Sequence, residues 1–170
     1  MSLARNSRVR AVKRGEAMIL FAVASYTFAI AATAVDEIRD AAALKPFTPS
    51  PRLRVPMVNH TLTRDNKIAF VVNGNTHFRL LPSPMTRVLL LRNAPVGLAV
   101  GQTHRMTEVS ALYTLPRAFT GEERNWYRGL ALIGDDVVPV MNPAAFLDEE
   151  QLERLHAEYA AIIRTKGATA

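Results

Sequence analysis

Ten prolines and eight glycines are spread along the 170 residues of this chain and divide it into short segments. Both residue types interrupt regular structure, so this distribution favours many short strands over a few long helices. Apolar residues make up 49% of the chain, which is enough for a sizeable core and excludes a disordered protein. A chain of this length normally forms one domain, or two small ones that share a core.

Three pairs of apolar runs, each separated by turn residues, predict β-hairpins. The pairs are Met18–Val23 with Tyr26–Ala31 around Ser25-Tyr26-Thr27, Arg87–Arg92 with Val96–Val100 around Asn93-Ala94-Pro95, and Leu130–Ile133 with Val137–Val140 around Gly134-Asp135-Asp136. A fourth hairpin is predicted around Asn73-Gly74, between the β-rich runs Ile68–Val72 and Thr76–Leu80. Asn-Gly suits a tight primed turn, in which both central residues need a positive φ.

Two segments between these hairpins have a different character. Val35–Leu44 is compatible with a continuing strand or with a short helix, and its periodicity does not decide between them. Lys45–Pro56 contains four prolines, so we expect an extended connection over the surface.

The last part of the chain predicts an amphipathic helix over residues 143–166. Asn142-Pro143 offers one start, with a side-chain cap followed by a proline, and Asp148-Glu149-Glu150 offers another. An apolar stripe with spacings of three and four then follows, formed by Leu152, Leu155, Tyr159 and Ile162. The two halves before this helix are alike in outline, so the sequence predicts two small β-barrels side by side, with the helix packing on them.

The N-terminal region combines a basic segment with a long uncharged run. Five basic residues precede Glu16, and we expect residues 1–16 to be a flexible tail. Ala17–Val35 carries no charge and ends in small residues, so a signal peptide or membrane span is an alternative. The break at Ser25-Tyr26-Thr27 and the strand length of each piece favour two strands of the folded protein instead.

No arrangement of residues typical of an active site occurs in the sequence. The chain has no cysteine, and its four histidines lie outside metal-ligand spacings, so neither a metal nor another cofactor is expected. We expect His77 to be a surface residue of a strand, and the spacing of His104 and Glu108 to be accidental. Asp36 and Glu37 are adjacent and should lie on opposite faces of a strand, which suits shared acid–base chemistry poorly. The sequence therefore indicates a protein that is not an enzyme.

Three segments in order resemble the CheW family of chemotaxis coupling proteins. They are Ile19–Val23 through Val35-Asp36-Glu37-Ile38, then Arg87–Leu91 with Val96–Val100, and finally Tyr127–Ala131 with Val137–Val140 and Phe146-Leu147. The resemblance covers most of the chain and implies a CheW-like domain over residues 17–155, built as two SH3-like β-barrels. It also implies a cytoplasmic, non-enzymatic adaptor that binds the regulatory domain of a CheA-like histidine kinase through barrel ends. Receptor cytoplasmic tips would bind in a groove between the barrels.

The chain departs from the family pattern at two positions. Asn73, in Val71-Val72-Asn73-Gly74, stands where the family usually has an arginine, and Gly101 stands where an aspartate is common. We nevertheless expect the partner-binding residues to be exposed around this hairpin and on Val96–Val100. They are Phe70, Val72, Asn73, Gly74, Phe78, Leu98 and Val100.

Nucleic-acid binding is a further alternative, carried by the N-terminal arginines with Arg52, Arg54, Arg64 and Arg87. Small barrels that bind nucleic acid usually interleave aromatic residues with the positive charge, and only Phe47 lies near these arginines. Neither a nucleic-acid partner nor a small-molecule substrate is therefore expected.

Overall fold

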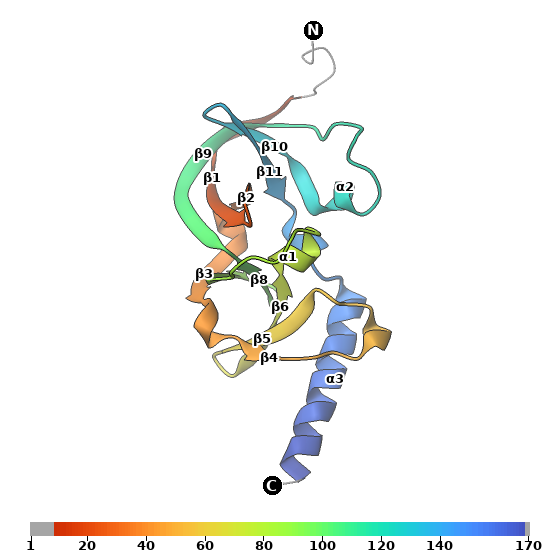
Figure 1. Ribbon diagram of the computed structural model, residues 1–170. Coiled ribbons are helices and arrows are strands. Elements are labelled where there is room, and N and C mark those ends of the chain that lie inside the picture. Colours follow the sequence, from red (N-terminus) through yellow and green to blue (C-terminus); the bar gives the residue numbers. More distant parts are fainter. Residues whose placement is uncertain (1–8, 169–170) are drawn as a thin grey trace.

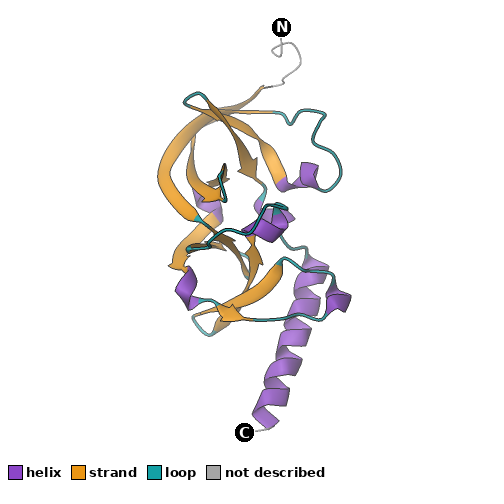
Figure 2. Ribbon diagram, viewed as in Figure 1, coloured by secondary structure: helices purple, strands orange, loops and turns teal. Residues whose placement is uncertain are grey.

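The computed structural model describes residues 9–168 and consists mainly of β-strands arranged in two barrel-like sheets (Figures 1 and 2). The first sheet is a closed barrel whose strand order is β1-β2-β11-β10-β9. Its strands come from both ends of the chain: β1 (Val9–Val23), β2 (Tyr26–Ala31), β9 (Gln102–Tyr113), β10 (Tyr127–Ile133) and β11 (Asp136–Met141).

The second sheet has six strands and is formed by the middle of the chain. Its strand order is β3-β7-β8-β6-β5-β4. Its strands are β3 (Val35–Asp40), β4 (Lys45–Pro46), β5 (Val58–Arg64), β6 (Lys67–Asn73), β7 (Arg87–Leu91) and β8 (Val96–Val100). The two barrels predicted from the sequence are therefore present, but they are not successive halves of the chain, because the second is inserted between β2 and β9 of the first.

The remaining elements are short helical turns and one long helix. The α-helices are α1 (Gly74–His77), α2 (Glu123–Trp126) and α3 (Glu149–Ala168), and the 3-10 helices are η1 (Ala32–Ala34), η2 (Ala41–Ala43), η3 (Pro51–Leu53) and η4 (Pro143–Ala145). The segment Val35–Leu44, left open above, is thus a strand followed by a 3-10 turn. The connection Lys45–Pro56 includes the two-residue strand β4 at the edge of the sheet, a position where a proline is tolerated.

Three of the four predicted hairpins are confirmed, namely β1–β2, β7–β8 and β10–β11. The prediction of a hairpin around Asn73-Gly74 is wrong. The tight turn lies eight residues earlier, at Asp65-Asn66 between β5 and β6, and both residues have positive φ, of 49° and 61°. Asp65 and Asn66, and not Asn73 and Gly74, therefore have the two positive φ values that a primed turn needs.

The boundary expected for the N-terminal tail differs in the structure. Strand β1 begins at Val9, which pairs with Tyr113 of β9, and Ala11 pairs with Ala111. Residues 9–16 of the expected 1–16 tail are therefore part of a strand, and residues 1–8 lie outside the described residues. The uncharged run that follows forms strands with two buried faces: Met18 packs with residues of β2, β9, β10 and β11, and Phe21 and Ile30 pack in the core shared with the six-stranded sheet.

The C-terminal helix uses the second of its two predicted starts. Asp148 and Gln151 cap α3 reciprocally: Asp148 Oδ1 accepts from the Gln151 amide at 2.7 Å, and Gln151 Oε1 accepts from the Asp148 amide at 2.9 Å. Asn142-Pro143 instead begins η4, with the Asn142 side chain accepting from the Ala144 amide. The helix expected over residues 143–166 therefore begins at Glu149.

Helix α3 runs along the six-stranded sheet and continues beyond it (Figure 1). Its Leu155 is completely buried, and Tyr159 meets Phe47 edge to face, with ring centroids 5.8 Å apart. Glu158 Oε1 accepts from the Ser50 amide at 2.8 Å, which ties the helix to the loop before η3. The helix thus covers one side of the core that fills the six-stranded barrel.

Candidate functional site

The five apolar residues predicted to bind partners are buried. Phe70 and Val72 on β6, and Leu98 and Val100 on β8, have no exposed surface, and Phe78, after α1, is 7% exposed. The prediction that these side chains are exposed is wrong. The physical reason is that β8 lies between β7 and β6 and pairs in parallel with β6, so neither edge of β8 is free and both of its faces are covered.

Asn73 and Gly74 have structural roles at the start of α1. Asn73 Oδ1 accepts from the Thr76 amide at 3.2 Å, which is the hydrogen bond of a helix N-cap. Gly74 is buried against β8, and Gly101, the second departure from the family pattern, lies against the backbone of Ala22, whose carbonyl accepts from its amide at 2.8 Å. Local packing and capping therefore account for these positions.

An exposed apolar row crosses three neighbouring strands at one end of the closed barrel. Val140 of β11 pairs with Ala29 of β2 in parallel, and both are buried. Val137 and Tyr26 lie three residues before Val140 and Ala29 on the same two strands. Because successive side chains of a strand point to opposite faces, this odd spacing places Val137 and Tyr26 on the outer face of the barrel. Leu132 of β10 is the antiparallel partner of Val137. Tyr26, Val137 and Leu132 are 56%, 63% and 55% exposed, and we call them the barrel-end row.

A groove beside the barrel-end row extends its apolar surface. Leu20, Ile133 and Pro139 contribute to its lining together with Tyr26 and Val137. Exposed apolar surface that continues over several side chains marks interaction sites more often than single exposed residues do. The sequence analysis missed this surface, because the strand Val137–Val140 is apolar at every position and its sequence does not show which face is exposed.

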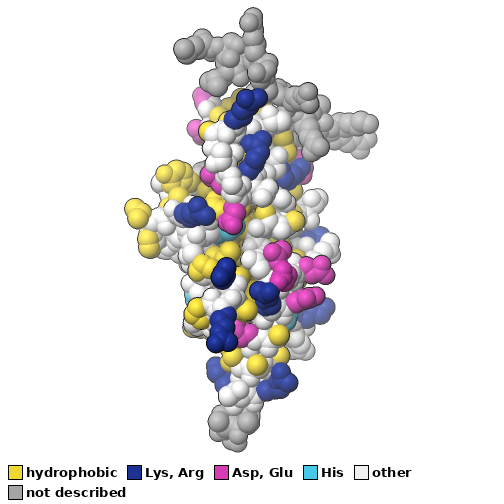
Figure 3. Space-filling model, turned by 90° about the vertical axis from the view of Figure 1, so that its right-hand side faces the viewer, with side chains coloured by type: hydrophobic (Ala, Val, Ile, Leu, Met, Phe, Trp, Pro, Cys, Tyr) yellow, Lys and Arg dark blue, Asp and Glu magenta, His cyan; other side chains and the backbone are white. Residues whose placement is uncertain are grey.

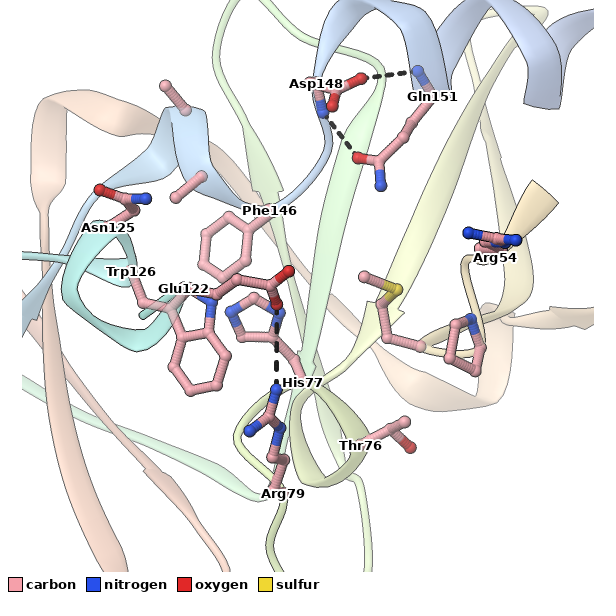
Figure 4. A pocket seen from close by; sticks show the side chains of 14 residues that line it. Arg54, Thr76, His77, Arg79, Glu122, Asn125, Trp126, Phe146, Asp148 and Gln151 are labelled. Atoms are coloured by element: carbon pink, nitrogen blue, oxygen red, sulfur yellow. Dashed lines mark hydrogen bonds and ion pairs between the residues drawn. The ribbon is translucent and has the colours of Figure 1, made fainter. Parts of the chain in front are cut away.

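A cleft of about 490 Å³ lies where α1, α2 and the start of α3 come together (Figure 4). His77 lines it and is only 6% exposed, so the prediction of a surface histidine is wrong. Its ring contacts Trp126 and Phe146, with centroid distances of 4.7 and 5.1 Å. Burial, with a smaller contribution from the positive charge of Arg79, lowers the pKa of His77 to about 4, so the ring is neutral at pH 7.

The same aromatic cluster continues into the closed barrel through Tyr127. Its ring stacks parallel to those of Phe28 and Phe78, at 6.4 and 6.5 Å. Burial, and secondarily the charge of Glu123, raises the pKa of Tyr127 to about 12. The cluster is therefore uncharged at neutral pH and joins the two barrels as one apolar unit.

Charged residues of β3 form a network of ion pairs on the six-stranded sheet. Arg64 lies 2.7 Å from an oxygen of Asp36 and 3.9 Å from one of Glu37, and Arg92 lies 3.4 Å from Asp36. Asp36 and Glu37 were expected on opposite faces, but a register shift between Val35 and Glu37 lets both reach Arg64. Two arginines of the alternative nucleic-acid surface are thereby neutralised, since Arg87 also pairs, at 3.2 Å, with Asp40.

Neither a metal site nor a membrane-spanning helix is found among residues 9–168. Within residues 9–168, no group of three or more histidine, cysteine, aspartate or glutamate side chains is placed to hold a metal ion. In the same part of the chain, no helix has both the length and the apolar character needed to cross a membrane.

Comparisons with known proteins bear on both the family and the fold. The model of the CheW-like domain matches residues 17–151. This chain belongs to the CheW-like domain family. Among solved structures, the scaffolding protein TtCheW from Thermoanaerobacter tengcongensis is similar, with a TM-score of 0.66 and 14% identity, over 80% of this chain and 95% of that one. No curated protein matches the sequence.

The matched range covers both barrels apart from residues 9–16 of β1, but only the beginning of α3. The matched range ends at Gln151, the third residue of the helix. Residues 152–168, which include the buried Leu155, therefore extend the CheW-like domain of this chain. The arrangement of two SH3-like barrels that the resemblance implied is confirmed by the fold shared with TtCheW.

Proposed function

We propose that this chain is a non-enzymatic adaptor that acts in the cytoplasm and couples chemoreceptors to a CheA-like histidine kinase. Membership of the CheW-like family supports the adaptor role, and TtCheW is itself described as a scaffolding protein. The observation that carries the proposal is the barrel-end row. It presents three large apolar side chains on adjacent strands, at a barrel end of the kind that the family resemblance associates with the kinase.

The barrel-end row replaces the buried residues predicted from the sequence as the kinase-binding surface. Tyr26 and Leu132 are near the turn-proximal ends of their strands, so the β1–β2 turn and the β10–β11 turn border the row. A regulatory domain that caps this end would bury an aromatic and two aliphatic side chains together. Burial of such anchors contributes most of the free energy of binding in protein interfaces.

The receptor must bind elsewhere if one adaptor is to hold both partners. Ile38 on β3 and Met106 on β9 are 41% and 62% exposed, and each belongs to a different barrel. We propose these two side chains as the first positions to test for the receptor tip, because a segment bound between the barrels would contact both sheets. Met106→Asp should then weaken receptor binding and leave kinase binding unchanged.

The kinase interface can be tested by calorimetric titration of the full chain with the regulatory domain of a CheA-like kinase. Val137→Asp should weaken binding by about tenfold or more, since it places a charge in the apolar centre of the interface. Ile163→Asp is the matched control, because Ile163 is 50% exposed on α3, away from the row. Equal binding by the wild-type chain and by Val137→Asp would remove the row from the interface, and no binding by the wild-type chain would reject the kinase as partner.

A further inference from the structure

The cleft at His77 has the size and the lining of a small-molecule site. Its volume of about 490 Å³ falls within the range typical of ligand pockets. Met57, Phe146 and Trp126 contribute apolar surface, and Thr76, Asn125 and Gln151 contribute polar groups. More than half of the lining residues are polar or charged, so the cleft suits a ligand that combines an apolar body with polar groups.

The buried nitrogen of His77 has no hydrogen-bond partner. Nε2 is inaccessible to solvent and is unpaired among the described residues. A buried polar atom without a partner costs about 1–3 kcal/mol, so its retention calls for an explanation. Because the ring is neutral at pH 7, Nε2 can donate or accept one hydrogen bond, depending on the tautomer. A ligand atom that reaches it would supply the missing partner.

Two exposed charged side chains that line the cleft with His77 are weakly held. Arg79 and Glu122 meet at 3.8 Å, and their side chains are 75% and 84% exposed. The guanidinium of Arg79 also lies 5.7 Å from the centre of the Trp126 ring. An exposed ion pair at this separation contributes little free energy, so both side chains can move aside for a ligand.

Of the four charged side chains that line the cleft, Arg54 is the one available to a ligand. Arg79 and Glu122 pair with each other, and Asp148 accepts the amide hydrogen bond that caps α3. The Arg54 side chain makes no hydrogen bond or ion pair within residues 9–168, and it lies across the cleft from Trp126 (Figure 4). Its backbone has φ 53°, a left-handed conformation that costs a non-glycine residue about 1–2 kcal/mol. The helical side of the molecule, seen in Figure 3, carries both basic and acidic side chains.

From these observations we propose that the cleft binds a small organic carboxylate with an aromatic or aliphatic body. The carboxylate pairs with Arg54, and the body lies against Met57, Phe146 and Trp126. A polar atom of the ligand reaches His77 Nε2 once the Arg79–Glu122 pair opens. The cleft shares no residue with the barrel-end row, so this proposal does not rest on the adaptor role. A bound carboxylate would make the protein responsive to a metabolite.

The position of Trp126 supplies a direct test, because it is the only tryptophan of the chain. The full-length protein is titrated with phenylacetate at constant ionic strength while the emission of Trp126 is followed, and phenylacetamide serves as the uncharged probe of the same shape. We expect a saturable change with a Kd of about 1 mM for phenylacetate, as its size allows, and binding about fivefold weaker for phenylacetamide.

Two variants assign the binding to this cleft. Arg54→Gln should remove the preference for the carboxylate, while Arg52→Gln, an exposed arginine two residues away that does not line the cleft, should retain it. The proposal is overturned if phenylacetate gives no saturable change up to about 20 mM. It is equally overturned if the amide binds as well as the acid, or if Arg52→Gln loses as much affinity as Arg54→Gln.

Discussion

Gly74 lies so close to Ala99 that a Cβ atom added to it would be 2.6 Å from the Ala99 carbonyl oxygen. The side chain of Val23, from the other barrel, lies 3.1 Å from the same point. The contact therefore fixes α1 against β8 and against the closed barrel together. Only a glycine permits this approach of two backbones.

Gly74→Ala should lower the free energy of unfolding by about 2–3 kcal/mol, because the neighbouring backbone has little freedom to move. Urea unfolding of the purified variant measures the effect. Gly167→Ala, within α3 and with no atom within 4 Å of its added Cβ, is the control and should not destabilise the protein. A loss below about 0.5 kcal/mol in Gly74→Ala would contradict the close approach.

Asn73 should matter for stability rather than for partner binding. Asn73→Ala removes the N-cap of α1 and should cost about 1 kcal/mol, whereas Asn73→Asp keeps an acceptor for the Thr76 amide and should cost less. Thermal unfolding of the two variants compares them. If both retain wild-type stability but lose kinase binding, Asn73 is a contact residue and the capping role is secondary.

These two residues show where the sequence reasoning reached its limit. Asn73-Gly74 has the composition of a hairpin turn, but local composition does not reveal which strand β6 pairs with. Its partners are β5, through the Asp65-Asn66 turn, and β8, through a parallel crossover that includes α1. The structure around Asn73-Gly74 depends on which strands pair with β6, and the periodicity of the sequence carries no information about strand pairing.

The hairpins and the terminal helix were predictable because their signals are local. Asn93 and Gly134 have positive φ in their turns, as the turn chemistry requires, and α3 begins at a capping sequence. The exposed surface was not predictable in the same way. A run such as Val137–Val140 is apolar on both faces, and only the completed barrel determines that Val137 faces outward while Val138 is buried.

The packing of α3 on the six-stranded barrel predicts a strong effect of one leucine. Leu155→Ala removes a completely buried side chain and should cost about 2–4 kcal/mol. Ile163→Ala, on the part of α3 where the side chain is half exposed, should cost less than about 1 kcal/mol. Denaturant unfolding of both variants measures the difference, and equal small losses would mean that the helix is not docked in solution.

The buried imidazole of His77 predicts a loss of stability in acid. Its pKa is lowered from 6.5 to about 4 in the folded chain, so below pH 6.5 the unfolded chain takes up a proton that the folded chain does not. The free energy of unfolding should therefore fall as the pH decreases from 6.5 to 4, by about 3 kcal/mol in total.

His77→Phe keeps an aromatic ring in the cluster and should remove this part of the pH dependence. His104→Gln changes an exposed histidine and should leave the dependence as it is in the wild-type chain. Urea unfolding at pH 7 and at pH 4.5 distinguishes the variants. A His77→Phe protein that loses as much stability in acid as the wild type would show that the ring is not held neutral.

The proposed coupling role is tested most directly by measuring whether this chain joins the two partners. Membranes that contain a chemoreceptor are sedimented with a CheA-like kinase, with and without the full-length chain, and the kinase in the pellet is quantified. We predict that the chain increases the pelleted kinase and that Val137→Asp abolishes the increase. The same amount of pelleted kinase with and without the wild-type chain would contradict the proposal.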